Sequence, residues 1–157
     1  MKVLFLDIDG VVNCATTTQR HRGTIGIDPY MAFLVGKITL DTGCKVVLSS
    51  TWRHWEDARE EVRKQVVDFI DITPSMPIPY SEKERLGLSS MAELCERGKE
   101  IADWLVRNPT VERYAILDDD SDMLPEQLPN FFKTSWQTGL TEEIANRVTE
   151  HLNSSIK

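Results

Sequence analysis

Two carboxylates stand close together near the start of the chain, directly after a short apolar run. Asp7 and Asp9 follow the apolar residues 3–6 at a spacing of two, and Gly10 comes next. Carboxylates held this close repel each other unless a cation or a shared proton compensates their charge. This stretch therefore predicts a metal site.

Two other apolar runs also end in polar residues. Ser49 follows the run at 46–48, and the run at 114–117 ends in an acidic stretch that holds Asp118, Asp119 and Asp122. Clustered carboxylates without cysteine or histidine suit a hard cation such as Mg²⁺. Taken alone, the acidic stretch is also compatible with an exposed turn. The prediction of a metal site therefore depends on this stretch lying beside Asp7 and Asp9.

The elements that must bring these groups together alternate along the chain. Apolar runs predict strands at 3–6, 45–48, 69–72, 114–117 and 131–134, and helical patterns lie between them and after the last. Helices are expected from residue 28 to about 42, over 55–67, up to about 107, and from 141 to about 152. Parallel strands direct their carboxyl ends to one edge of a sheet, so the polar groups should converge there. We predict an α/β, three-layer Rossmann-like domain with a central parallel sheet of about five strands.

Composition bounds the remaining choices. The 157 residues suffice for a single domain, 1–157, with a full core. A net charge of −7 argues against nucleic-acid binding through bulk electrostatics, and three cysteines argue against a disulfide framework. We expect neither a signal peptide nor a membrane span, and therefore a cytoplasmic protein without a membrane partner. Residues 73–90 contain three prolines and predict a long loop.

The motifs together resemble the haloacid dehalogenase (HAD) superfamily. The matching segments are DIDGVV at 7–12, VVLS at 46–49, a basic residue at the start of a helix, and ILDD at 116–119 with Asp122 behind. These are the four signature motifs of the superfamily in order, and they cover nearly the whole chain. The run SSTWR at 49–53 is similar to one in small HAD proteins grouped with RNA-repair systems.

The resemblance implies a role for each matching residue. Asp7 corresponds to a nucleophile that forms an aspartyl-phosphate, and Asp9 to the general acid and base. Ser49 corresponds to the hydroxyl that binds the transferring phosphoryl group. The implied Mg²⁺ ligands are Asp118, Asp7 and the backbone carbonyl of Asp9, while Asp119 and Asp122 are further candidates for holding or orienting the metal.

The remaining site residues are less sharply assigned. Arg97 and Lys99 both offer a cation near a helix start, and we favour Arg97 because it should lie at the mouth of the sheet. A flap at 16–23 carries a basic stretch that could meet a phosphorylated substrate, or could equally be a merely solvated loop. The residues expected to contact substrate are Gly10, Ser50, Arg53, Arg20 and Arg22.

An acid at position 9 indicates an oxygen leaving group, because halide leaves without a proton. The resemblance thus implies a phosphatase or phosphotransferase, and the intervals between motifs leave no room for a folded cap domain. An open site suits a macromolecular substrate, and we expect a nucleotide or a polynucleotide end. The alternatives are a phosphoprotein phosphatase and a non-catalytic phosphate-binding or scaffold module; the oligomeric state stays open.

Overall fold

The strand β1 (Lys2–Leu6) lies at the centre of the sheet in the computed structural model, which describes residues 1–76 and 96–155. Within these residues the sheet has five strands in the order β5-β4-β1-β6-β7, and every neighbouring pair is parallel. The other strands of this sheet are β4 (Lys45–Leu48), β5 (Asp71–Ile72), β6 (Arg113–Asp118) and β7 (Phe131–Lys133).

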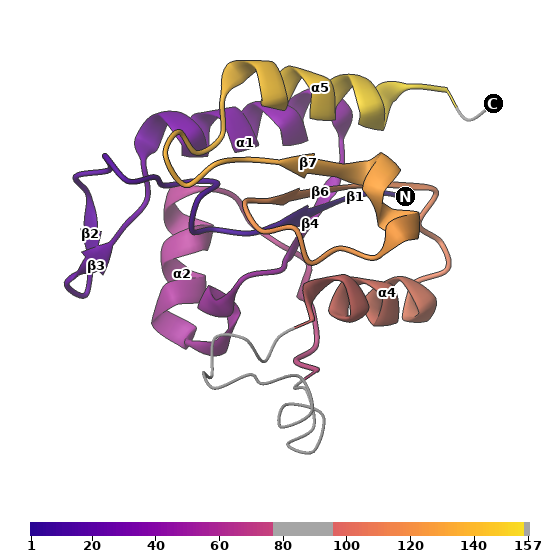
Figure 1. Ribbon diagram of the computed structural model, residues 1–157, viewed down its shortest axis with the longest axis horizontal. Coiled ribbons are helices and arrows are strands. Elements are labelled where there is room, and N and C mark those ends of the chain that lie inside the picture. The colour runs from indigo at the N-terminus through magenta and orange to yellow at the C-terminus, as the bar shows by residue number, and fades with distance from the viewer. Residues whose placement is uncertain (77–95, 156–157) are drawn as a thin grey trace.

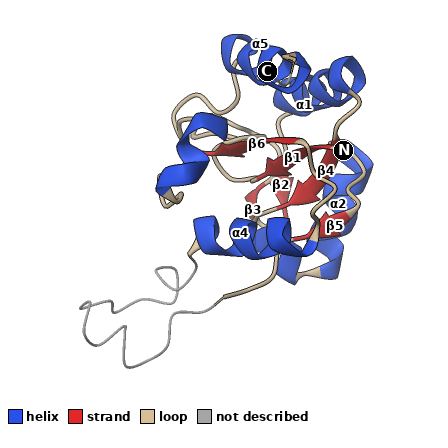
Figure 2. Ribbon diagram, turned by 90° about the vertical axis from the view of Figure 1, so that its right-hand side faces the viewer, coloured by secondary structure: helices blue, strands red, loops and turns tan. Residues whose placement is uncertain are grey.

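Helices cover both faces of the sheet. In the described part of the chain the α-helices are α1 (Pro29–Thr42), α2 (Glu56–Gln65), α4 (Arg97–Arg107) and α5 (Glu142–Asn153), with two 3₁₀ helices, η1 (Thr51–His54) and η3 (Pro125–Asn130). Figures 1 and 2 show α1 and α5 side by side on one face and α4 on the other. This arrangement confirms the predicted three-layer α/β fold.

Strand β1 alternates between two apolar clusters. Leu4 and Leu6 belong to the cluster that includes residues of α1, α2 and α5, whereas Val3 and Phe5 pack with Trp104 of α4. A strand covered on both faces explains why its sequence is continuously apolar. No helix in the described part of the chain is long and apolar enough to cross a membrane.

Local signals fix several helix ends. The Asp28 side chain accepts hydrogen bonds from the backbone of Tyr30 and Met31, and Gly43 ends α1 in a left-handed conformation with φ 67°. The Thr141 hydroxyl accepts from the backbone of Ile144 at the start of α5.

The structure corrects three expectations. The strand predicted at 69–72 pairs only at Asp71–Ile72, because Phe69 turns into the core before the chain joins the sheet edge. The flap forms a hairpin of β2 (Arg20–His21) and β3 (Thr24–Ile25), and η1 precedes α2 where no helix was expected. Most of the predicted loop at 73–90 lies outside the described residues.

Candidate active site

The polar ends of three neighbouring strands lie level with one another. Leu6 of β1 pairs with Leu48 of β4 and with Leu117 of β6, and the next residues along these strands are Asp7, Ser49 and Asp118. The backbone N–H of Asp7 donates to Leu117, and that of Ser49 donates to Leu6. The sheet register therefore brings these three side chains to one edge, where all are buried.

Three carboxylates meet at this edge. Asp7, Asp118 and Asp119 form an acidic cluster in which one ligand oxygen from each lies within 4.8 Å of the others. Burial raises the pKa of Asp7 to about 6, an effect that the nearby Arg97 opposes. Burial, reinforced by the charge of Asp7, raises the pKa of Asp118 to about 9, and burial also raises that of Asp119. Negative charge is thus crowded here, and a donor set made only of oxygens fits Mg²⁺.

Arg97 is the cation that reaches the acidic cluster. It begins α4, and its side chain lies 3.3 Å (Nε) from Oδ2 of Asp118 and 3.9 Å (Nη2) from Oδ1 of Asp7. Its Nη1 also donates to Oγ of Ser49 at 3.5 Å. Lys99 instead pairs with Glu96 at the surface, at 2.5 Å. Of the two cations predicted from the sequence, the structure therefore places Arg97 beside the acidic cluster and Lys99 in an ion pair at the surface.

Gly98 explains how Arg97 comes so close to the sheet. A Cβ atom at this glycine would lie 2.7 Å from the backbone nitrogen of Leu124 and 2.9 Å from the carbonyl oxygen of Asp122. The helix start therefore packs directly on the loop after β6. The Asp122 carboxylate accepts from the backbone N–H of Arg97, so it orients the helix start and lies outside the acidic cluster.

Gly10 makes room for the third carboxylate. Its φ is +78°, and a Cβ atom there would overlap the carboxylate of Asp119. Its carbonyl oxygen accepts from the hydroxyl of Thr134 at 2.6 Å, and its N–H donates to the Asn13 side chain. Only glycine combines this backbone conformation with so close an approach.

The whole chain was compared with known proteins. Over residues 3–145 it matches the family model described as the HAD domain in Swiss Army Knife RNA repair proteins. The chain belongs to this family. Searches of curated proteins and of solved structures gave no match. Membership indicates a HAD-type hydrolase at the level of the superfamily, and it confirms the resemblance to HAD domains of RNA repair.

In this HAD domain the carboxylate of Asp9 is held apart from the acidic cluster. Its two oxygens accept hydrogen bonds from Nδ2 of Asn13 at 2.9 Å and from Nε1 of Trp52 at 3.2 Å. Asn13 is fully buried and also donates to the carbonyl of Gly26. Asn13 was not among the site residues predicted from the sequence. Its position four residues after Asp9 could have indicated that its side chain contacts that carboxylate.

Ser50 forms a hydrogen bond with Asp7, the candidate nucleophile. Its hydroxyl forms a hydrogen bond that lowers the pKa of Asp7 against the larger effect of burial, and it also accepts from the backbone of Trp52. Ser50 therefore joins the acidic cluster to the start of η1.

Arg53 lies in the interior rather than at the mouth of the site. Its guanidinium is buried and donates to the carbonyls of Ser50 and Thr73 and to Oε2 of Glu100 at 3.0 Å. The expectation of a substrate contact does not fit this placement, because the charge is already paired with a buried carboxylate. Glu100 itself was missed, since it reads as an ordinary residue of a charged helix.

The flap cations lie on the hairpin away from the acidic cluster. Arg20 donates to the carbonyls of Thr17 and Gln19 within its own loop. Arg22 pairs with Asp57 of α2 at 2.7 Å and remains largely exposed. Both arginines are exposed, so neither is placed by the structure against the acidic cluster.

Proposed function

We propose that this chain is a Mg²⁺-dependent phosphomonoester hydrolase. The observation that carries the proposal is the acidic cluster at the ends of β1 and β6 with the Arg97 guanidinium beside it. An anionic nucleophile can approach an anionic phosphate only where cations neutralise the charge that develops. When bound by Asp7, Asp118 and Asp119, Mg²⁺ would supply most of that neutralisation.

The chain's own residues account for the two chemical steps. In the first, the Asp7 carboxylate attacks phosphorus, the bond to the leaving oxygen breaks, and Asp9 protonates that oxygen. In the second, Asp9 takes a proton from water, which attacks the phosphorus of the aspartyl-phosphate and releases inorganic phosphate and free Asp7. Arg97 and Ser49 would hold the equatorial oxygens of the phosphoryl group.

The positions of Asp7 and Asp9 support this division of roles. Asp7 lies at the bottom of the site with the cluster, whereas Asp9 is oriented by Asn13 and Trp52 and is only partly buried. In an in-line displacement the leaving oxygen lies opposite the attacking oxygen of Asp7, and we propose that these two hydrogen bonds orient the Asp9 carboxyl toward it. The family description favours phosphorylated nucleic acid as substrate, and we propose a nucleotide or polynucleotide end phosphate.

Hydrolysis of an aryl phosphate, measured with Mg²⁺ and after chelation, tests the proposal. Asp7→Asn should lower kcat by at least about a thousandfold, since it removes the group that forms the covalent bond. Asp120→Asn is the matched control, because Asp120 is an exposed neighbour of the cluster and should retain activity. Acid-quenched wild-type enzyme should carry a phosphoryl group on Asp7.

Two results would contradict the proposal. Asp7→Asn activity within about tenfold of wild type, a barrier change of only about 1.4 kcal/mol, would reject the nucleophile. A wild-type protein that hydrolyses no nucleotide, oligonucleotide, sugar phosphate or phosphopeptide, but binds phosphate, would instead be a non-catalytic phosphate-binding module.

A further inference from the structure

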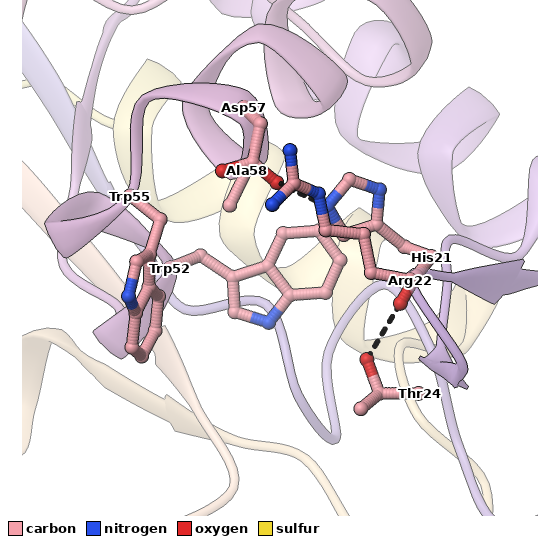
Figure 3. A pocket seen from close by; sticks show the side chains of 7 residues that line it. All are labelled: His21, Arg22, Thr24, Trp52, Trp55, Asp57 and Ala58. Atoms are coloured by element: carbon pink, nitrogen blue, oxygen red, sulfur yellow. Dashed lines mark hydrogen bonds and ion pairs between the residues drawn. The ribbon is translucent and has the colours of Figure 1, made fainter.

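A cavity of about 290 Å³ lies between the hairpin and the segment formed by η1 and α2 (Figure 3). Three of its lining residues are aromatic: His21 from the hairpin, and Trp52 and Trp55 from η1 and its end. Ligand pockets commonly begin near this volume, so the cavity suits one ring system rather than a large ligand. None of the acidic cluster is among the residues that line it.

Trp52 connects this cavity to the catalytic site. Its indole lines the cavity, and its Nε1 donates to Oδ2 of Asp9 at 3.2 Å. A ligand in the cavity would therefore lie one indole ring away from the proposed acid and base. If Asp9 protonates the leaving oxygen, as proposed, the cavity lies on the leaving-group side of the phosphate.

The inner wall of the cavity is already assembled. His21 stacks on Trp52 with ring centroids 5.3 Å apart and planes 29° from parallel. Nε2 of His21 lies 3.0 Å from Oδ2 of Asp57, which holds the imidazole in place from α2. A preassembled aromatic wall binds a planar ligand without having to order its own side chains.

Trp55 stands on the other side of Trp52 and is 58% exposed. A large indole exposed beside a cavity offers a free π-face for stacking. The polar groups of Arg22, Asp57 and Thr24 lie around the same cavity. A ligand that matches all of these has a flat aromatic face and an edge that bears both donors and acceptors.

We infer that this cavity binds the nucleobase of the phosphorylated nucleotide whose phosphate lies at the acidic cluster. The inference rests on the proposed function and narrows its substrate to nucleotides and nucleic-acid ends. Stacking on an aromatic side chain holds a base without demanding one sequence. In this arrangement the sugar would pass Trp52 between the base and the phosphate.

A phosphotyrosine side chain fits the geometry less well. Its ring is bonded directly to the leaving oxygen, so the ring would lie beside Asp9, whereas the cavity lies beyond Trp52. Its phenyl ring would also offer no hydrogen-bonding edge to Arg22 and Asp57, which already pair with each other.

The test compares two substrates that differ only in the base: adenosine 5′-monophosphate and ribose 5-phosphate. Trp55→Ala should raise KM for the nucleotide by about 5- to 150-fold, the range expected for loss of one stacking contact, with kcat little changed. The same variant should leave ribose 5-phosphate unaffected, and Trp55→Phe should recover most of the loss. Trp136→Ala is the matched control, because Trp136 is partly exposed and does not line the cavity.

Oligonucleotides phosphorylated at either end, with and without a base on the terminal residue, extend the comparison to nucleic acid. A preference for the base-bearing end that Trp55→Ala removes would support the inference. Equal KM for all matched substrates, an equal effect of Trp55→Ala with and without the base, or a preference for a phosphotyrosine peptide would overturn it.

Binding separates this inference from the proposed catalysis. Calorimetric titration of the Asp7→Asn protein with the same two ligands should show tighter binding of the nucleotide, weakened by Trp55→Ala. If this result appears while the wild type hydrolyses nothing, the proposed function fails and the base pocket stands. If hydrolysis occurs but the two ligands bind equally, the base pocket fails and the proposed function stands.

Discussion

Replacing Glu100 by glutamine should destabilise the fold by about 3–5 kcal/mol. The carboxylate of Glu100 and the guanidinium of Arg53 are 0% and 1% exposed, and they lie 3.0 Å apart. Glutamine has nearly the same shape and keeps an oxygen for the backbone N–H of Met76, which donates to Oε1 at 3.1 Å. The substitution therefore removes little but the charge, and it deprives the buried Arg53 cation of the counter-charge of Glu100.

Urea denaturation followed by circular dichroism measures this loss directly. In thermal unfolding the same loss corresponds to a fall in Tm of roughly 6–20 °C for a domain of this size. Glu150→Gln is the matched control, since Glu150 is exposed near the end of α5 and should change stability by less than about 0.5 kcal/mol.

A double variant identifies the origin of the effect. Arg53→Met with Glu100→Gln removes both charges, so its destabilisation should be smaller than the sum of the single variants by about 2 kcal/mol or more. Full recovery is not expected, because Arg53 also donates to the carbonyls of Ser50 and Thr73, which the methionine would leave without this donor. A Glu100→Gln loss below about 1 kcal/mol, or strict additivity in the double variant, would refute the reasoning.

Three further predictions concern the site itself. Gly10→Ala should cost more stability than Gly43→Ala, because both glycines have positive φ but only the first would place a Cβ atom against a carboxylate; equal losses in urea would contradict the clash. Because the pKa of Asp118 in the folded protein is raised to about 9 from 3.8, the metal-free protein should lose stability as pH rises from about 4 to 9. Mg²⁺ should oppose this loss. Asp118→Asn should make stability depend less on pH over the same window. A Tm in chelator that rises over this window, or that ignores Mg²⁺, would count against the cluster. Arg97→Ala should lower kcat on an aryl phosphate by at least about tenfold, whereas Lys99→Ala should leave kcat unchanged. Equal activities of the two variants would contradict a role of Arg97 in the reaction.

The strands and the convergence of their ends could be predicted because their signals are local. A continuous apolar run that stops at Asp7, Ser49 or Asp118 identifies both a buried strand and its carboxyl end. Parallel order then brings the ends together without knowledge of any distant contact. The same logic favoured Arg97 over Lys99, since the first residue of a helix that follows a strand edge lies nearest the site.

The partners of individual side chains could not be predicted in this way. Arg53 follows the second motif and resembles a substrate ligand, but the residue that neutralises it, Glu100, lies 47 positions further along the chain. The hairpin is likewise anchored by Asp57 of α2, which is 36 positions from His21. Such pairs depend on how helices pack on the sheet, and nothing in the local spacing of the charges encodes that packing.

The anchoring of the hairpin bears on how an open site can select its substrate. Among the described residues, the interval between β1 and β4 holds only this hairpin, α1 and short connections, so it provides no folded cap. His21 and Arg22 both contact the Asp57 carboxylate, which ties the hairpin to α2 beside the candidate active site. This fixed side wall is the part of the described chain that can select a substrate beside the phosphate. A wall of this kind suits a substrate that continues away from the protein, because the rest of a polynucleotide can leave through the open side while its terminal base remains against Trp52.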